Sequence, residues 1–253
     1  MRRYVKLFSV LFFCSVLALG FTSCSDDDGY SLDKYWESLV TVNKIGDNTY
    51  DFTLDNGERL WVAAPVGLSL NPKYDRAIIN YTILSDNFQG YDHAVKLNGY
   101  YDVLTKNSIY IASDDKVKQD SIGYDPIRVH AMWESGGYLN IHFGINTDGT
   151  VSHMLNLVSA DPDKEIGKNA VKLEFRHNKK NDPEHYPANG YVSFDLTPYK
   201  AAGPSKVTFE ITWTDFDGEK KAKTIEYIFD EAGSRPAGVI LTKNEDTTNL
   251  NIY

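Results

Sequence analysis

Hydrophobic and polar residues alternate along most of this chain from Trp36 onward, and a period of two residues is typical of β-strands. In residues 171–175 (VKLEF) every second side chain is apolar, and residues 207–213 (VTFEITW) extend the same pattern. A strand of this kind packs one face on a core and leaves the other face to solvent. Only residues 32–36 show a pattern that would suit a helix, so we predict an all-β protein.

The first part of the chain, residues 34–115, is predicted to form a small OB-like barrel. Its β-branched and aromatic runs lie at residues 39–42, 50–54, 60–62, 77–84, 94–104 and 108–111. Asn56-Gly57 indicates a two-residue hairpin, because both residues tolerate positive φ, and Gly99 can bend a long strand. Strands of this number and order, with an opening meander, suit a partly open barrel. A small sandwich would have the same periodicity, so the pattern leaves both architectures open.

The second part, residues 124–253, is predicted to be an antiparallel, immunoglobulin-like β-sandwich. It is separated from the first by a polar, charged stretch that ends in the turn-forming pair Asp125-Pro126. Its expected strands are residues 127–133, 138–145, 153–158, 171–175, 191–196, 207–213 and 223–229. Short strands at this spacing, separated by glycine-containing turns, are typical of sandwich domains.

The N-terminus has the features of a secretory signal peptide. Arg2, Arg3 and Lys6 precede an apolar run, residues 7–21, that is too short for a transmembrane helix. Removal of residues 1–23 would change the formal net charge from −9 to −12, because three basic residues are lost. Such an acidic chain has no basic block with which to contact a phosphate backbone, so we expect no nucleic-acid partner.

The two cysteines decide how the mature chain is held. Cys14 lies inside the apolar run and would leave with the signal peptide, so Cys24 would be the only thiol and an internal disulfide is excluded. Phe21-Thr22-Ser23-Cys24 matches a bacterial lipobox at its last three positions, with Phe21 in place of the usual Leu. We therefore predict that Cys24 is acylated, since more than one acyl chain anchors a protein stably. Cleavage by ordinary signal peptidase at Thr22 and Ser23 is the alternative.

An acidic stretch, Ser25, Asp26, Asp27 and Asp28, follows the cysteine. A solvated tether covering residues 24–33 is one interpretation, since short acidic runs are usually hydrated. The stretch also resembles the acidic signal that follows the lipidated cysteine in surface-exported lipoproteins of the Bacteroidota. That resemblance implies a lipid-anchored protein of the outer membrane that faces the cell exterior.

Catalytic and cofactor motifs are missing from the sequence. There is no G-x-S-x-G, H-E-x-x-H, GxxxxGK[ST] or GxGxxG pattern in a suitable context. We therefore expect no enzyme activity and no cofactor, although scattered Ser, His and Asp residues leave a motif-poor active site open.

Six histidines are the remaining candidates for metal binding: His93, His130, His142, His153, His177 and His185. Of these, His130 and His142 are the pair that a predicted hairpin brings together. A three-residue loop at residues 135–137 would pair Trp133 with Leu139 and place the two imidazoles opposite each other on the outer face. A zinc site needs further protein ligands, so we expect a solvated or hydrogen-bonded pair and no metal site.

Several segments together resemble the NigD-like lipoproteins. They are the lipobox with its acidic stretch and residues 76–84 (RAIINYTIL), 137–143 (GYLNIHF), 153–158 (HMLNLV), 175–178 (FRHN) and 191–196 (YVSFDL). Their order is that of the family over nearly the whole chain. The resemblance implies an N-terminal OB-like domain followed by a C-terminal β-sandwich. The family takes its name from a bacteriocin-associated operon, which implies an accessory or immunity role, and it offers no catalytic residues.

Three functions remain open at this point. The favoured one is a surface lipoprotein that binds a protein or glycan partner through one or both β domains. A second is protection against, or handling of, a bacteriocin. A third is glycan binding as the main activity, because the chain has 17 Tyr, 12 Phe and 4 Trp, although aromatic residues also fill the cores of β-sandwiches.

Overall fold

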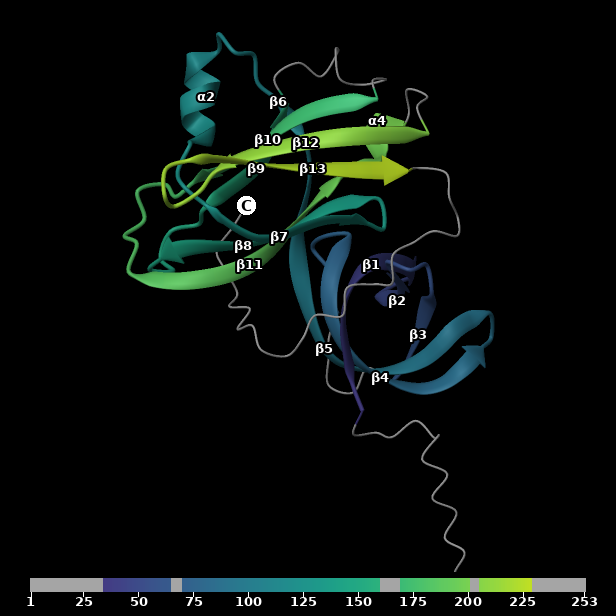
Figure 1. Cartoon of the computed structure of the whole chain (residues 1–253). Coiled ribbons are helices and arrows are strands. Elements are labelled where there is room, and N and C mark those ends of the chain that lie inside the picture. The colour runs from purple at the N-terminus through teal and green to yellow at the C-terminus, as the bar shows by residue number, and fades with distance from the viewer. Residues whose placement is uncertain (1–33, 65–69, 160–168, 201–204, 229–253) are drawn as a thin grey trace, which may run out of the picture. The chain divides into compact units, whose positions relative to one another are not determined.

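The computed structural model describes residues 34–64, 70–159, 169–200 and 205–228, and almost all regular structure within them is β-strand (Figure 1). The strands are β1 (Trp36–Gly46), β2 (Thr49–Leu54), β3 (Arg59–Ala64), β4 (Arg76–Phe88), β5 (Tyr91–Asn107), β6 (Ile109–Tyr110), β7 (Arg128–Ser135), β8 (Tyr138–Thr147), β9 (Met154–Ser159), β10 (Ala170–Asn178), β11 (Tyr186–Asp195), β12 (Lys206–Thr214) and β13 (Lys220–Ile228). The helices are α2 (Lys116–Ile122) and α4 (Thr197–Lys200). Each strand overlaps a run expected from the hydrophobic pattern, and the all-β fold class is confirmed.

The first five strands form a closed barrel, which confirms the OB-like prediction. Neighbouring strands follow the order β1-β2-β3-β5-β4 and back to β1, and the parallel pair β3–β5 closes the barrel. Hydrophobic side chains that point inward from these strands fill its interior. They include Val40, Phe52, Leu60, Ile79 and Val95, all of which are buried.

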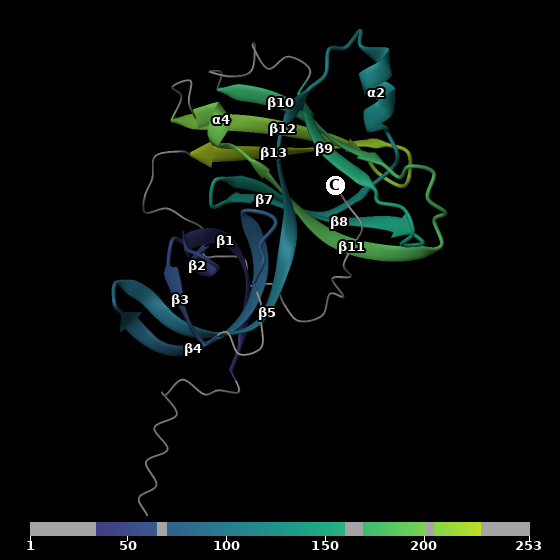
Figure 2. The same cartoon turned by 180° about the vertical axis from the view of Figure 1, so that it is seen from behind.

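Strand β5 belongs to both halves of the protein. Its first part pairs with β3 and β4 in the barrel, and its residues 104–107 pair in parallel with residues 192–195 of β11 (Figure 2). The strand changes register against β4 beside Gly99, the residue expected to bend it. Such bulges bend a strand and increase its twist, which suits a 17-residue strand that runs through two domains.

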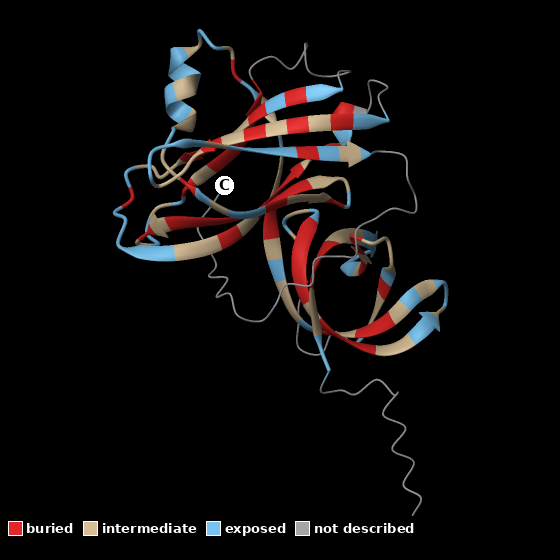
Figure 3. Cartoon of the chain, viewed as in Figure 1, coloured by how far each residue is buried: buried red, intermediate tan, exposed pale blue. Residues whose placement is uncertain are grey.

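Two sheets build the second half of the protein, in agreement with the predicted sandwich. One continues from the barrel in the order β3-β2-β1-β4-β5-β11-β8-β7, and the other has the order β13-β12-β10-β9-β6. Along the strands of both sheets, buried residues are interspersed with exposed ones (Figure 3). Phe143, Phe175, Phe194 and Phe209 belong to the core between the two sheets.

Some strand pairs of the sandwich are parallel, whereas the sequence predicts an antiparallel fold. These pairs are β5–β11, β10–β12 and β6–β9. Because β6 pairs with β9, residues 109–110 lie in a sandwich sheet and not with the barrel strands among which the sequence places them. Hydrophobic periodicity identifies strands but contains no information on their direction or partners.

Helix α2 lies in the polar stretch between barrel and sandwich, where the hydrophobic pattern indicates no helix. Its N-terminus is capped by Asp115, whose side chain accepts a hydrogen bond from the Lys118 amide at 3.1 Å. The helix buries none of its residues, so it lacks the apolar stripe that would predict it. The predicted helical window at residues 32–36 is not helical in its described part, where β1 begins at Trp36. Nowhere in the described ranges is a helix both long and apolar enough to cross a membrane.

A buried ion pair lies within the barrel at its boundary with the sandwich. Arg76 at the start of β4 binds both carboxylate oxygens of Asp55, at 2.6 and 2.9 Å. Ser135 donates a hydrogen bond to the same carboxylate, Asn140 donates to Ser135, and Ser193 donates to Asn140. These five buried side chains are called the arginine network.

The turn that places Asp55 is the hairpin predicted at Asn56-Gly57. Gly57 has a φ of +93°, and its amide donates to the Leu54 carbonyl at 2.8 Å. Asn56 does not have positive φ, so the turn differs from the type I′ form that an Asn-Gly pair favours. The predicted hairpin is therefore present, but its loop has three residues, 55–57, and not the predicted two, because the Leu54 amide donates to the Glu58 carbonyl.

Candidate functional site

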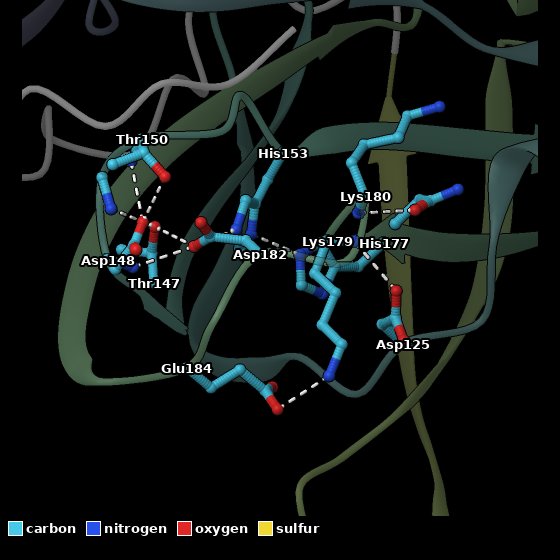
Figure 4. A network of polar contacts seen from close by, with 12 residues as sticks. Asp125, Thr147, Asp148, Thr150, His153, His177, Lys179, Lys180, Asp182 and Glu184 are labelled. Carbon is cyan, nitrogen blue, oxygen red and sulfur yellow. Dashed lines mark hydrogen bonds and ion pairs between the residues drawn. The ribbon is translucent and has the colours of Figure 1, made fainter.

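A row of buried polar side chains crosses one end of the sandwich, and it is called the histidine network (Figure 4). His153 precedes β9, His177 lies near the end of β10, and Asp182 lies in the loop that follows β10. His153 Nδ1 is 2.9 Å from His177 Nε2, and His153 Nε2 is 3.1 Å from Asp182 Oδ2. All three side chains are buried.

Hydrogen-bond direction determines where His177 carries its proton. Its Nδ1 lies 3.0 Å from the Pro126 carbonyl oxygen, which can only accept, so Nδ1 is the protonated nitrogen. Burial lowers the pKa of His177 to about 4, against a weaker opposing effect of that carbonyl. The ring is therefore neutral near neutral pH, and its Nε2 offers a lone pair to His153.

Asp182 is held as a carboxylate. Burial alone would raise the pKa of this group, but hydrogen bonds from Thr147, the Asp148 amide and His153 outweigh burial and keep the pKa below its usual range. All three donors reach the same oxygen, Oδ2, at 2.7, 2.9 and 3.1 Å. His153 thus lies between the Asp182 carboxylate and the lone pair of His177, within hydrogen-bond distance of both.

The side chains of the histidine network are hydrogen-bonded in a row, as in a proton relay, but the partners at both ends of the row are groups of the protein. His153, His177 and Asp182 are 0 %, 2 % and 3 % exposed, so a substrate has no access to their reactive atoms. No group of three or more His, Cys, Asp or Glu side chains in the described ranges could hold a metal ion. The role of the network is structural, because its hydrogen bonds hold the loop after β10 and the backbone at Pro126 against the start of β9.

The sequence contains a signal for these two histidines that motif searches miss. His177 continues the two-residue apolar period of residues 171–175, and His153 begins the period of residues 153–157. Both rings consequently point to the core side of their strands, where His177 faces Leu155 in the β9–β10 pairing. Strand parity could therefore have identified them as buried histidines among the six candidates of the sequence.

The β7–β8 hairpin has a different register from the predicted one. Its loop has two residues, Gly136 and Gly137, both with positive φ, where the sequence predicts a loop of three. Trp133 therefore faces Asn140, so its predicted pairing with Leu139 is wrong. Two successive glycines favour the shorter loop, because both central residues of a type I′ turn need positive φ.

His130 and His142 lie side by side in spite of this change, because a β-bulge at His130 compensates for it. Their ring centroids are 4.7 Å apart. His130 Nε2 lies 2.9 Å from Asn189 Oδ1, and the His142 ring stacks on Tyr191 at 4.5 Å. A Cβ on Gly144 would lie 2.7 Å from His130 Nε2, so this glycine makes room for the ring. In the described part of the chain, no third ligand completes a metal site here.

Two further predictions concern residues that the structure does not describe. Cys24, the predicted lipidation site, and the predicted export signal Ser25, Asp26, Asp27 and Asp28 lie outside the described residues. The same is true of the signal peptide. These parts of the sequence analysis remain predictions.

A groove of about 330 Å³, called the α2 groove, lies on the outer face of the five-stranded sheet beside α2. The sheet contributes Lys172, Glu174, Arg176, Glu210, Thr212 and Lys220 to its lining. Gln119 of α2 lies on the opposite wall. Ligand sites usually have volumes of about 300 to 1,000 Å³, so the groove has room for a small ligand or a short stretch of peptide.

Arg176 holds α2 against the sheet. Its guanidinium donates to the Gly123 carbonyl at 2.9 Å, to the Gln119 carbonyl at 2.7 Å and also to the Gln119 side-chain oxygen. The Tyr124 ring covers the guanidinium, with its centroid 3.5 Å from Cζ. Since α2 buries no side chain of its own, these polar contacts keep it in place. Strand β10 thus contacts the polar stretch between barrel and sandwich from both faces of its sheet. Arg176 makes these contacts on the outer face, and His177 makes them on the core face.

Comparisons with known families agree with this architecture. The model of the NigD-like N-terminal OB domain matches residues 39–103. The model of the NigD-like C-terminal beta sandwich domain matches residues 109–227. A search of curated proteins found no match for this chain.

Several crystal structures have the same fold. A protein described only as toxin-related, from Parabacteroides distasonis, is 31 % identical, with a TM-score of 0.66 over 78 % of this chain and 95 % of that one. A protein of unknown function from Bacteroides vulgatus is 26 % identical, with a TM-score of 0.66 over 81 % and 95 % of the two chains. A NigD-like immunity protein from Bacteroides caccae is 25 % identical, with a TM-score of 0.61 over 79 % and 100 %.

Proposed function

This chain belongs to the NigD-like family, and from that premise we propose that it is a lipid-anchored accessory protein that binds a macromolecular partner without catalysing a reaction. Relatives described as an immunity protein and as toxin-related support an accessory or immunity-like role. The observation that carries the non-catalytic part of this proposal is the closure of the histidine network. Its rings are the candidates for acid–base chemistry at this end of the sandwich, yet they are buried and bonded to one another and to Asp182.

Anchoring through Cys24 is the part of this proposal that can be tested most simply. Acylation would attach the mature chain to the outer membrane, and Asp26, Asp27 and Asp28 would direct it to the cell exterior. Cys24→Ala should move the protein from the membrane fraction to the soluble fraction. Cys14→Ala is the matched control, because Cys14 lies in the segment that leaves with the signal, and it should leave fractionation unchanged. Membrane association of the Cys24→Ala protein would disprove the lipid anchor.

Surface exposure requires a separate measurement. Protease added to intact cells should degrade the wild-type protein if it faces outward. Replacing Asp26, Asp27 and Asp28 together by Asn should leave the protein in the membrane but protect it from the protease. Equal degradation of both proteins would show that the acidic stretch is only a tether.

The binding role is tested by crosslinking in intact cells with the anchored protein as bait. A specific protein or glycan crosslinked to the wild-type chain, and absent when free soluble chain is added in excess, is the expected result. Recovery of the bait alone under conditions that capture a known complex would count against a binding function.

A bacteriocin-related role is the second candidate, because one similar structure is a NigD-like immunity protein. Deletion of the gene should then increase the sensitivity of the cells to a bacteriocin, and the plasmid-borne gene should restore resistance. Unchanged sensitivity across a panel of bacteriocins from related strains would leave the more general binding role as the only one supported.

A further inference from the structure

The α2 groove is a basic spot on an acidic protein. Lys172, Arg176 and Lys220 line it together with Glu174 and Glu210, so cations outnumber carboxylates there, whereas the whole chain has a formal net charge of −9. The rim contains two exposed ion pairs, Lys172–Glu210 at 3.4 Å and Lys220–Glu174 at 2.9 Å. Exposed pairs of this kind are weak and can exchange partners. A lysine of the rim can therefore leave its glutamate and turn toward an incoming anion, and no buried contact is broken when it does.

Arg176 is a buried cation whose hydrogen-bond acceptors are all neutral oxygens. Its side chain is only 2 % exposed, but unlike the histidine network it belongs to the lining of the α2 groove, and its Nε forms an ion pair with the Glu174 carboxylate at 4.0 Å. Three of the five guanidinium N–H groups are used in bonds to Gly123 and Gln119. Two N–H groups thus remain for another acceptor. Its ion pair with Glu174 is long, and Glu174 is shared with Lys220 at 2.9 Å, so a second carboxylate in the groove would further neutralise this cation.

Neighbouring side chains on β5 and β9 add to the excess of donors. Asn156 faces Arg176 in the β9–β10 pairing and is 3 % exposed, and its amide nitrogen has no hydrogen-bond partner among the described residues. Its amide oxygen accepts from Lys106 Nζ at 2.6 Å. Burial lowers the pKa of Lys106, which otherwise donates only to the Leu155 carbonyl. A buried cation, a partly buried one and an amide nitrogen without a partner among the described residues therefore lie on neighbouring strands, although neither Lys106 nor Asn156 lines the groove itself.

We infer that the α2 groove binds a carboxylate carried by a protein partner, an Asp or Glu side chain or a C-terminus, with Arg176 and Lys220 as the receiving cations. The inference rests on the proposed binding function and specifies the binding site and the chemical group that it recognises. A planar guanidinium matches a carboxylate better than any other side chain does. The residues that line the groove include no aromatic ring on which a sugar could pack. The volume of about 330 Å³ fits one acidic side chain with its neighbours.

The decisive variant is Gln119→Glu. Gln119 already touches the Arg176 guanidinium through its side-chain oxygen, so the isosteric glutamate would place a permanent carboxylate on the cation and compete with the ligand. This change keeps the bond from Arg176 to the side-chain oxygen but removes the one that Gln119 Nε2 donates to the Ala112 carbonyl at 3.1 Å, so the amide spectrum of the variant must first show that α2 is still in place. Gln89→Glu is the matched control, because it adds the same charge in the β4–β5 turn of the barrel. Lys220→Gln removes the second receiving cation from an exposed position.

The probe is the acetylated and amidated peptide Gly-Gly-Asp-Gly-Gly, and its Asn analogue is the negative control. Titrated into the purified wild-type chain and followed by backbone amide shifts, the Asp peptide should perturb the residues of the α2 groove, and the Asn peptide should not. Gln119→Glu should weaken binding by about tenfold or more, Lys220→Gln by a few-fold, and Gln89→Glu should not change it.

Three outcomes would overturn the inference. The first is equal binding of the Asp and Asn peptides, and the second is unchanged affinity of the Gln119→Glu variant for the Asp peptide. The third is binding of phosphate or trigalacturonate by a chain that does not bind the Asp peptide, which would indicate another class of ligand. These results differ from failure of the proposed function itself. Peptide binding in the groove together with no crosslinked partner in cells would leave the site valid and refute only the cellular role.

Discussion

The arginine network and the histidine network are both buried, yet they hold the protein by different means. The first joins the barrel to the sandwich through the hydrogen bond from Ser135 to Asp55, the carboxylate that Arg76 binds. The second holds one end of the sandwich through His153, His177 and Asp182. A guanidinium keeps its proton at any pH at which proteins fold, whereas imidazole titrates in mild acid. Mild acid should therefore act first on the end of the sandwich, and the two networks can be separated experimentally.

Breaking the arginine network should have the largest effect. Asp55→Asn removes the counterion and leaves the Arg76 guanidinium buried at 0 % exposure. Such a change typically lowers the free energy of unfolding by about 3 to 5 kcal/mol. Urea denaturation of the purified chain measures this loss.

A double variant separates the ion pair from its surroundings. Asp55→Asn combined with Arg76→Met removes both charges, so the double variant should be more stable than Asp55→Asn alone. If the two substitutions were simply additive, the buried pair would not be the interaction that joins the barrel turn to β4.

Mild acid should weaken the histidine network, with the next largest effect. His177 has a pKa of about 4 in the folded protein and an ordinary value of 6.5 in an unfolded chain. Between these pH values the unfolded state binds more protons than the folded state, so stability falls as the pH decreases. The total loss is roughly 3 kcal/mol, since one pKa unit corresponds to about 1.4 kcal/mol. Unfolding free energies measured from neutral pH down to about pH 4 check this.

His177→Gln is the control for this pH dependence. It removes the titrating ring, so the curve should be flatter in the same window even though the variant is less stable at neutral pH. Asp182 acts at lower pH, because its folded pKa lies below the ordinary value of 3.8, so the unfolded state takes up a proton first and the stability from this carboxylate is lost as the pH falls from about 3.8 toward the folded pKa. Identical slopes for wild type and His177→Gln would contradict the assignment of a neutral, buried His177.

The difference between the two networks also explains what can be predicted from sequence. His153 and His177 lie at the inward-facing positions of alternating strands, so strand parity alone marks them as buried. Arg76 lies on the outer side of a barrel strand, and there the Tyr138 ring, 4.9 Å from its Cζ, and the β7–β8 turn at Gly136 cover it. Local periodicity describes one strand at a time and cannot show which surface another domain will cover.

The strands could be predicted from their hydrophobic runs, and so could their assignment to a barrel and a sandwich, except for β6, which pairs with β9. Helix α2 could not, since it buries no side chain and is held by Arg176 from a strand far away in the sequence. The register of the β7–β8 hairpin depended on the loop length and on a bulge at His130, which hydrophobic spacing does not reveal. The segments at residues 76–84, 153–158 and 175–178 that resemble the family contain central residues of both networks.

A glycine beside the arginine network should have an intermediate effect. Gly136 has a φ of +60°, and a Cβ there would lie 2.7 Å from Asp55 Oδ1 and 3.0 Å from Arg76 Nη1. Gly149 also has positive φ, at +80°, but nothing lies within 4 Å of its Cβ position. Gly136→Ala should lose about 1 to 3 kcal/mol of stability, and clearly more than Gly149→Ala, whose loss reflects backbone strain alone. If urea denaturation gave equal losses of unfolding free energy for the two variants, the ion pair would be able to move away from the added methyl group without cost.

An exposed ion pair gives the smallest effect and shows what burial contributes to the arginine network. Lys206 and Glu226 are 2.8 Å apart with side chains 49 % and 60 % exposed, whereas Arg76 and Asp55 are 2.6 Å apart with 0 % and 2 % exposed. Because the distances are nearly equal, the two pairs differ mainly in their access to water. Lys206→Ala should change the free energy of unfolding by less than about 0.5 kcal/mol. A loss comparable to that of Asp55→Asn in the same urea series would mean that contact distance, and not burial, gives the arginine network its strength.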